Sequence, residues 1–597
     1  MLVFGCLLIC FALMFWASGR GYGTSLDAYY MVMSSDPYSC DFSLTGFGYL
    51  LHPLYLLAQG DIQSFRIIGI VLLAASAALF GFAHANFCAA RIETPQGYIL
   101  VALTVTICVF LQFASFWLAT PNYNSLNLCA LLVFYSGVIW AATPPRIGSM
   151  HGNVETVSVA ILTGLAIAVM MLTKPTSGII AALLGVAWVI TLRTPRPVMC
   201  IAVTGAAALL GFLVGAFWID GSIAAYVQRN ILGLHIFSLQ VRPGGNLHGL
   251  RRSFFGPFRS EEQWMIIKDS GIGLAILGVA LVAIFDGVRL SRWRFPIIAG
   301  AAALTLLILA LRALRIENSE FFAIAFTLWY AAFGISAVVG LIVVLRAVRN
   351  SSNTETRRFA SAAILLSIGP IIYAFGTGGA VILQAPHAGV FWSAALLLVA
   401  LLAPIERRRR SLNFVGLLCS VATVGLIIGG MAASGALGAS IWRQNEPLSV
   451  GPHGGSALLT DSQTAHYFKA MQHAANENGF QADAPVIDLS YQGPGLAFAL
   501  GGRTLGTAWI EDEGSGRVSF SCAALQTVAR GELASAWIIT GHWETLRTVQ
   551  AALHCAGLDF PAEYNPVGSA DRKDLNWHQT LWKPTGAEWA RHGRRTP

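Results

Sequence analysis

The amino-acid sequence predicts a polytopic α-helical membrane protein that ends in a small α/β domain. Of its 597 residues, 55% are hydrophobic and only 11% are charged, whereas soluble globular domains carry about 25% charged residues. The mean hydropathy is +0.62. Apolar runs long enough to span a bilayer as helices recur up to residue 432. After residue 440 the apolar density falls, which indicates a second region outside the membrane.

The apolar runs predict thirteen membrane-spanning helices, and an odd number places the two chain termini on opposite sides. We expect these helices near residues 2–19, 66–90, 98–118, 124–143, 156–173, 176–193, 197–218, 271–288, 295–311, 321–345, 359–376, 388–404 and 412–432.

Basic residues predict the orientation of the helices. With the N-terminus inside, the short inner loops carry a dense set of arginines, including the run Arg407–Arg410 before the last predicted helix, whereas the short outer turns hold only Lys174, Arg312 and Arg315. Short loops rich in arginine stay on the cytoplasmic side. The net charge of +8 therefore reports topology and does not indicate nucleic-acid binding. We expect a multi-pass protein of a bacterial inner membrane, with loops 20–65 and 219–270 and the C-terminal region facing the periplasm.

The chain divides by composition into a transmembrane region, residues 1–438, and an α/β domain, residues 439–597. A helix is predicted over Ser462–Asn478, capped by Asp461 or Ser462. The segments "APVIDLSY" and "ASAWIITG" are typical of buried strands, and "TLRTVQAALHCAGL" of a second helix. Cys522 and Cys555 are a candidate disulfide if this domain faces an oxidising compartment.

The first outer loop, "TSLDAYYMVMSSDPYSCD", carries carboxylates and aromatic residues. Asp27 begins a helical pattern, so it either caps that helix or acts as a general base. A carboxylate in that role deprotonates an acceptor hydroxyl as it attacks a sugar carbon. Tyr29 and Tyr30 are candidate substrate contacts. Asp36 is a candidate second carboxylate, although "SSDPYS" favours a turn.

Further polar residues are expected on the same side. Lys174 ends the fifth predicted helix, where it either reaches lipid headgroups or binds the phosphate of a lipid donor. Asn122 and Asn124 are candidates for binding a sugar. Alternatively, one of them caps the next helix, and we expect that residue to be Asn124. Gln384 and His387 are candidates for lining the cleft. The alternative for His387 is a purely structural role.

The loop 219–268 contains an amphipathic segment, "GSIAAYVQRNILGLHIFSL", which is expected to lie in the membrane plane. The basic stretch that follows holds Arg242, Arg251 and Arg252. Arginine side chains bind phosphates through two hydrogen bonds, so these are candidate phosphate ligands. Contact with lipid headgroups is the alternative.

The ten cysteines show no metal-ligand spacing. The sequence also has no phosphate-binding or dinucleotide-binding glycine motif, which argues against ATP-driven transport. No cofactor is certain, and a divalent metal stays open.

Four motifs, in order over roughly the first 200 residues, resemble the C-type (GT-C) glycosyltransferases of the protein-mannosyltransferase and aminoarabinose-transferase superfamily. They are "LDAYYMV", "SFRIIGIVLLAASA", "ATPNYNSLNLCALLV" and the triplet Leu172–Lys174. The resemblance implies a GT-C-like fold, a polyprenyl-phosphate sugar donor, a catalytic role for Asp27 and a donor-phosphate contact at Lys174. The family often has Asp-Glu at the first motif. Here no Glu follows Asp27, which counts against metal assistance.

The favoured function is an inverting glycosyltransferase that moves a sugar from a polyprenyl-phosphate donor to an outer-face glycan, lipid or protein acceptor. A transporter or flippase of lipid-linked saccharides, or a non-catalytic membrane assembly protein, is the alternative. Transport needs polar residues near the bilayer midplane. The polar residues here gather at the outer rim, which favours transfer.

Overall fold

The computed structural model describes residues 1–240 and 354–585. Short gaps within these ranges lie at 41, 93, 115–118, 144–151, 193, 195, 377–380, 404, 433–439, 453–454, 510–516, 542–545 and 573–576.

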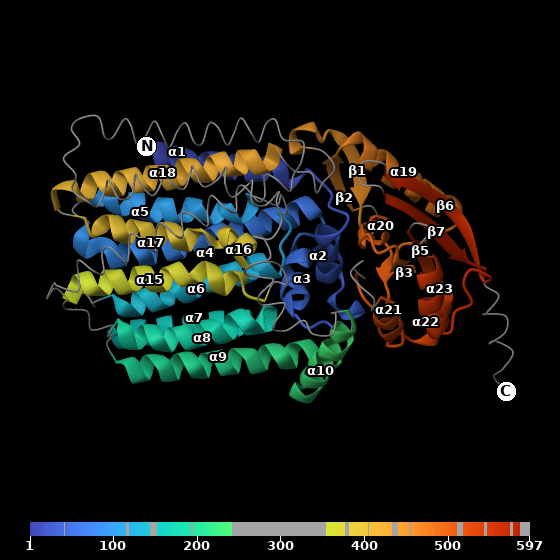
Figure 1. Cartoon of the computed structure of the whole chain (residues 1–597), viewed down its shortest axis with the longest axis horizontal. Helices are drawn as coiled ribbons and strands as arrows, with labels where there is room; N and C mark the ends of the chain where they lie inside the picture. Colours follow the sequence, from blue (N-terminus) through green and yellow to red (C-terminus); the bar gives the residue numbers. More distant parts are fainter. Residues whose placement is uncertain are drawn as a thin grey trace, which may run out of the picture.

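A bundle of apolar helices lies along the long axis of the molecule (Figure 1). It contains α1 (Leu2–Ser18), α4 (Ile62–Cys88), α5 (Pro95–Cys108), α6 (Tyr123–Ala142), α7 (Gly152–Thr173), α8 (Pro175–Thr191), α9 (Pro197–Asp220), α15 (Thr354–Ala374), α17 (Val390–Leu401) and α18 (Ile405–Ala432). Short helices η2 (Ala89–Arg91), η3 (Val109–Phe113), α16 (Val381–Gln384) and η5 (Ala385–Ala388) extend or join them.

Seven helices in the described ranges are long and apolar enough to cross a membrane, and α1, α8 and α17 are shorter apolar helices. These helices coincide with ten of the thirteen predicted segments. The other three, 271–288, 295–311 and 321–345, lie outside the described residues. The total of thirteen therefore stays a prediction.

Proline positions explain where several helices begin. Pro95, Pro175 and Pro197 are the first residues of α5, α8 and α9. Proline is favoured there because its missing N–H would have no partner within the helix. Pro175 therefore separates α7 from α8 and leaves Lys174 between them.

Four further elements lie at one end of the bundle, beside the C-terminal domain (Figure 1). They are α2 (Leu26–Ser35), η1 (Pro37–Ser39), α3 (Phe47–Leu57) and α10 (Ile223–Gln240). On α10, Val227, Ile231 and Leu234 are exposed, while Tyr226 and Arg229 are buried. This two-sided pattern agrees with the amphipathic character expected of the segment.

The C-terminal domain is built on a five-stranded sheet with strand order β4-β3-β5-β7-β6. Strand β3 is parallel to β4 and β5, whereas β7 is antiparallel to β5 and β6. The strands are β3 (Pro485–Leu489), β4 (Arg503–Thr504), β5 (Trp537–Thr540), β6 (Tyr564–Arg572) and β7 (Trp577–Pro584). A separate hairpin pairs β1 (Glu446–Val450) with β2 (Ser456–Thr460).

The helices of this domain are α19 (Ser462–Glu477), α20 (Gly495–Ala499), α21 (Arg517–Leu525), α22 (Arg530–Ser535) and α23 (Leu546–Cys555), and η7 (Ile441–Arg443) precedes the hairpin. The two predicted strands coincide with β3 and β5, and the two predicted helices with α19 and α23. Asp461 caps α19, since its Oδ1 accepts from the backbone N–H groups of Gln463 and Thr464.

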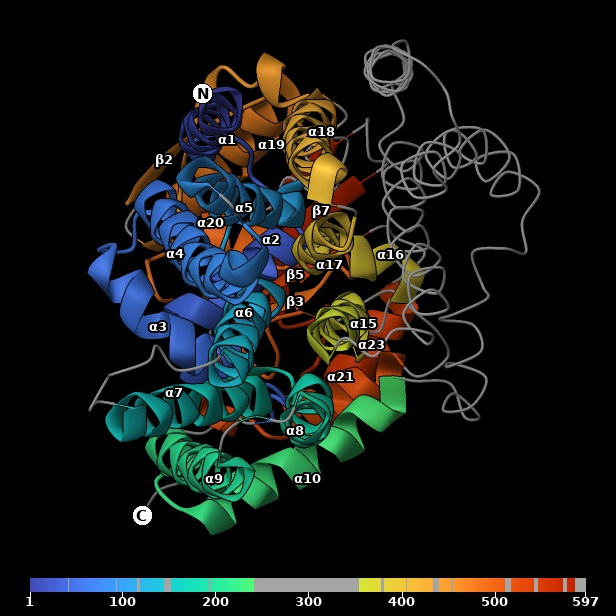
Figure 2. The ribbon, with the colours of Figure 1, turned by 90° about the vertical axis from the view of Figure 1, so that its left-hand side faces the viewer.

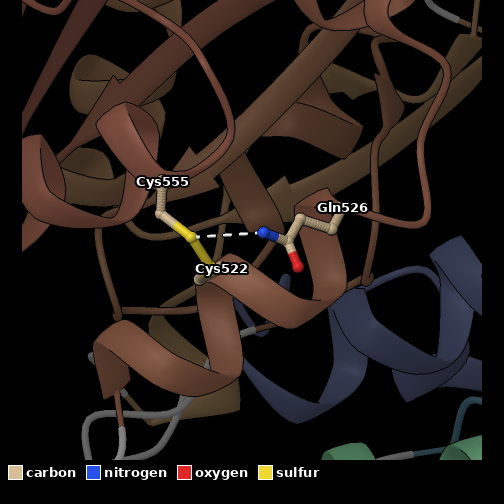
Figure 3. Close-up of a disulfide and its surroundings, with 3 residues drawn as sticks. All are labelled: Cys522, Gln526 and Cys555. Atoms are coloured by element: carbon tan, nitrogen blue, oxygen red, sulfur yellow. Dashed lines mark hydrogen bonds between the residues drawn. A yellow bond between two sulfur atoms is a disulfide. The ribbon is translucent and has the colours of Figure 1, made fainter.

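Cys522 of α21 and Cys555 of α23 form a disulfide, with their Cα atoms 5.7 Å apart. Gln526 donates a hydrogen bond to Cys555 Sγ at 3.4 Å (Figure 3). The bridge therefore ties α21 to α23, which pack against each other.

The C-terminal domain and the outer segments share one hydrophobic cluster. Tyr22, Phe47 and Phe65 from the N-terminal part belong to the same cluster as Phe468 and Phe498 from the C-terminal domain. Backbone hydrogen bonds cross the boundary as well: Gly21 N–H donates to Leu459 at 2.9 Å, and Leu459 N–H donates to Gly19 at 2.9 Å. The domain is thus docked on the segment that leads into α2.

Candidate functional site

Asp27 is the second residue of α2 and is buried, with 1% of its surface exposed. Ser25 occupies the N-cap position of this helix, so Asp27 is not the cap residue. Its Oδ2 accepts from Arg66 Nη2 at 2.8 Å and from the backbone N–H of Gly23 at 3.1 Å. Within the described residues Oδ1 has no hydrogen-bond partner. One carboxylate oxygen is therefore anchored and the other is unpaired.

Arg66 of α4 holds this carboxylate in place. Its guanidinium uses all five N–H donors, which reach Asp27 Oδ2, Thr120 Oγ1 and the backbone carbonyls of Ser18, Arg20 and Gly21 at 2.8–3.0 Å. A buried carboxylate requires such a partner. In the sequence, Arg66 had been singled out only as part of the second motif. A single arginine near the start of a long apolar run is itself a signal, because it is costly in a membrane unless it is paired.

Lys174 lies between α7 and α8 and is 3% exposed. Its Nζ donates to the backbone carbonyl of Tyr373. The ammonium lies 5.4 Å from the ring centroid of Tyr373 and 6.0 Å from that of Tyr123. None of the ion pairs between described residues involves Lys174. The structure thus holds a buried cation among aromatic rings without a carboxylate beside it.

A layer of aromatic rings joins α2 to Lys174. The ring of Tyr30, in the same helix as Asp27, lies 5.9 Å from that of Tyr123, and Tyr123 also contacts Lys174. The ring of Phe47 lies 5.9 Å from both tyrosine rings. The rings thus link α2, the helix that carries Asp27, to the surroundings of Lys174, and both charged residues are buried.

Tyr29 faces the C-terminal domain. Its ring lies 6.4 Å from that of Trp509 and 6.0 Å from that of Phe47. Asp36 lies between α2 and η1, where its backbone carbonyl accepts from Ser39 Oγ at 2.8 Å. This is the turn that "SSDPYS" favours.

Asn122, and not the expected Asn124, caps α6. Its Oδ1 accepts from the backbone N–H groups of Asn124 and Ser125 at 2.9 and 3.0 Å, and its Nδ2 donates to the carbonyl of Thr120. The expectation was wrong because Asn122, with its extended backbone, is the residue before the first helical turn. Asn124 Oδ1 is buried and has no partner among the described residues.

His387 supports the surroundings of Lys174. Its Nδ1 lies 3.2 Å from the carbonyl oxygen of Gln112, and Gln112 Oε1 accepts from the hydroxyl of Tyr373 at 3.0 Å. Tyr373 in turn accepts from Lys174. Gln384 is half-buried at the end of α16. Tyr373 and Gln112 thus lie between Lys174 and His387, each bonded on one side through its backbone carbonyl and on the other through its side chain.

The predicted phosphate ligands Arg242, Arg251 and Arg252 lie outside the described residues. Among the residues that the structure does describe, no group of three or more His, Cys, Asp or Glu side chains is arranged to hold a metal ion. An apolar cavity of about 150 Å³ lies between α6, α7, α8 and α9, and its lining residues include neither Asp27 nor Lys174.

No protein-family model and no curated protein sequence matches the chain. Several solved structures resemble it. The oligosaccharyltransferase of Archaeoglobus fulgidus in complex with Zn and sulfate is 11% identical, with a TM-score of 0.44 over 98% of this chain and 73% of that one. ArnT from Cupriavidus metallidurans bound to undecaprenyl phosphate is 12% identical, with a TM-score of 0.40 over 97% of each chain.

A third similar structure is the Archaeoglobus fulgidus oligosaccharyltransferase AglB with an inhibitory peptide and a dolichol-phosphate. It is 12% identical, with a TM-score of 0.44 over 95% of this chain and 72% of that one. At this degree of similarity, the function proposed below rests on the motifs and on the geometry of the site.

Proposed function

We propose that this protein is an inverting glycosyltransferase that uses a polyprenyl-phosphate sugar as donor and an outer-face glycan, lipid or protein as acceptor. The observation that carries the proposal is the state of Asp27. One of its carboxylate oxygens is held by Arg66 and Gly23, and the other is unpaired. A general base needs this arrangement, because it must be fixed in place and still have an oxygen ready to accept a proton.

In the proposed step, the acceptor hydroxyl gives its proton to Asp27 Oδ1 as its oxygen bonds to the anomeric carbon. The bond between that carbon and the phosphate oxygen breaks, and its electron pair leaves with the polyprenyl phosphate. Attack from the face opposite the leaving group inverts the configuration. Arg66 stays bonded to Oδ2 and neutralises the carboxylate between turnovers.

Lys174 contacts the donor phosphate in this proposal. Negative charge grows on the phosphate as it leaves, and a fixed cation stabilises that charge most in a site from which water is excluded. The rings of Tyr123 and Tyr373 and the Tyr373 carbonyl hold the ammonium in place. Since no described carboxylate pairs with Lys174, a phosphate meets no competing anion there.

Burial of both residues implies that substrates enter by a rearrangement of the outer segments. Asp27 is 1% exposed and Lys174 is 3% exposed. Closure over the bound donor would then exclude water, which protects an activated sugar from hydrolysis.

The test is transfer by purified protein in liposomes supplied with a panel of polyprenyl-phosphate sugars and candidate acceptors. We expect Asp27→Asn to lower kcat by about 10²- to 10⁴-fold, the usual range for loss of a general base. Glu477→Gln is the matched control, since it makes the same change at an exposed helix position.

An Asp27→Asn protein with full activity would refute the catalytic role. A folded wild-type protein that neither transfers nor hydrolyses any donor would favour transport. Movement of the lipid-linked sugar across the same liposomes would then be the decisive measurement.

A further inference from the structure

A loop of the C-terminal domain contacts the backbone immediately before Asp27. The segment Ser490–Gly495 runs from the end of β3 to the first residue of α20, and we call it the 490–495 loop. Gly495 N–H donates to the carbonyl of Thr24 at 2.9 Å. The hydroxyl of Tyr22 donates to the carbonyl of Gly495 at 2.7 Å. Two hydrogen bonds therefore join this loop to the segment 22–25.

The contact is so close that it requires glycine at two positions. A Cβ atom at Gly495 would lie 2.6 Å from Thr24 Cα, and one at Gly493 would lie 2.6 Å from Ser25 Cα. Gly493 also has a φ of +112°, which side chains rarely adopt. Backbone packs directly on backbone here, and an added methyl group must displace one of the two segments.

The segment 23–25 determines where Asp27 lies. Gly23 N–H donates to Asp27 Oδ2 at 3.1 Å, and the carbonyls of Gly23 and Ser25 accept from Ala28 and Tyr29 in the first turn of α2. A shift of this segment therefore shifts both the carboxylate and one of its two hydrogen-bond donors.

The 490–495 loop is itself tied to the sheet. Buried Ser490 donates to Asp488 Oδ1 of β3 at 2.6 Å and accepts from Gln579 Nε2 of β7 at 2.7 Å. Burial and the nearby charge of Asp27 raise the pKa of Tyr22 well above its usual range, so its hydroxyl keeps the proton that it donates. The Tyr22 ring also packs 5.1 Å from that of Phe468 in α19.

We propose that the 490–495 loop and Tyr22 position the catalytic carboxylate, so that the C-terminal domain takes part in catalysis through Asp27. This inference rests on the proposed function. Gly493, Gly495 and Tyr22 are positioning residues: they hold the first turn of α2 so that Asp27 Oδ1 meets the acceptor hydroxyl.

The activity test compares Gly493→Ala and Gly495→Ala with Gly531→Ala. The control adds the same methyl group in the same domain, at a position where a Cβ meets nothing within 4 Å. We expect the two loop variants to lower kcat by about 10- to 100-fold, as a displacement of about 1 Å does. The KM for the donor should stay within twofold, because the surroundings of Lys174 are untouched.

Hydrogen–deuterium exchange of the full-length protein gives a readout that needs no donor. The loop variants should speed exchange in a peptide covering residues 19–30 at least tenfold relative to Gly531→Ala, with exchange in α6 unchanged. Should a glycine variant fail to fold, Tyr22→Phe carries the same test, since it removes one hydroxyl and leaves the ring in place.

Exchange that stays slow in the variants would overturn the inference, as would faster exchange with kcat retained. An Asp27→Asn protein with full activity, or a folded wild-type protein inactive on every donor, refutes the proposed function, and the positioning role falls with it. Faster exchange in the loop variants would then show a structural contact and no catalytic role.

Discussion

The two buried charges of the site are held in opposite ways. Asp27 has a fully bonded guanidinium beside it, and that guanidinium also binds three backbone carbonyls and a threonine. Lys174 has one backbone carbonyl and two aromatic rings. The charge of Asp27 is compensated within the protein, whereas that of Lys174 is compensated by no described carboxylate.

The difference indicates what each residue is prepared to do. A compensated carboxylate is stable in the closed site and exchanges only a proton. An uncompensated ammonium is costly to bury, and an arriving anion removes that cost. We therefore expect different effects on stability when Arg66 is removed from beside Asp27 and when Lys174 is removed.

The largest effect is expected from Arg66→Met. It leaves the buried Asp27 carboxylate without its cationic partner, which costs about 3–5 kcal/mol in free energy of unfolding, and it abolishes transfer. Thermal unfolding in detergent measures the first effect. Arg443→Met, at an exposed position, is the matched control.

The double variant Arg66→Met/Asp27→Asn sharpens this prediction. Because it also removes the unpaired charge, it should recover part of the lost stability while staying inactive. An Arg66→Met protein that unfolds at the wild-type temperature would show that the ion pair does not hold the site together.

Lys174→Met should act on the donor instead of the fold. No carboxylate loses its partner, so the unfolding temperature should stay the same or rise. The KM for the polyprenyl-phosphate donor should rise about 10- to 100-fold, because a hydrogen bond to a charged group contributes about 1.5–3 kcal/mol. Lys469→Met, on the exposed face of α19, is the control. An unchanged donor KM would remove Lys174 from the phosphate site.

Asp488 tests the cost of burying a charge at a carboxylate that has no described cation beside it. Its Oδ2 has no hydrogen-bond partner among the described residues, and burial raises the pKa of Asp488 to about 6. The protonated form is therefore favoured by folding. Stability from this group is fully present below the unfolded pKa of 3.8 and is lost as the pH rises through about 6.

Asp488→Asn should raise the free energy of unfolding above pH 7 by on the order of 2 kcal/mol and should have little effect at pH 4. Melting curves at the two pH values, with Asp559→Asn at an exposed position as control, check this. An equal change at both pH values would contradict the assignment of the shift to Asp488.

The sequence predicted most of the described helices, since an apolar run and a proline are local signals. It also predicted β3, β5, α19 and α23, where periodicity and caps are strong. It did not predict the hairpin β1–β2 or the pair β6–β7. Strand β6 contains Asn565, Pro566, Gly568 and Asp571, residue types that are depleted in strands, and only the pairing with β7 explains its conformation.

The residue types of the site could be predicted from the sequence, but the contacts between those residues could not. Asp27 and Lys174 stood out by position, yet the links through Tyr30, Tyr123 and Tyr373 join segments that are far apart in the chain. Arg66 and the 490–495 loop were missed for the same reason. Their roles follow from contacts across 39 residues for Arg66 and Asp27 and 473 residues for Tyr22 and Gly495, and no local pattern encodes such contacts.

The hydrophobic cluster shared by the outer segments and the sheet domain has a consequence for cooperativity. Residues such as Phe468 and Phe498 are buried partly by Tyr22 and its neighbours, so a fragment beginning at residue 439 would carry an open apolar face into water. The change in composition near that residue marks where the chain leaves the lipid. It does not mark a folding unit, and the outer half of the protein should melt in a single transition.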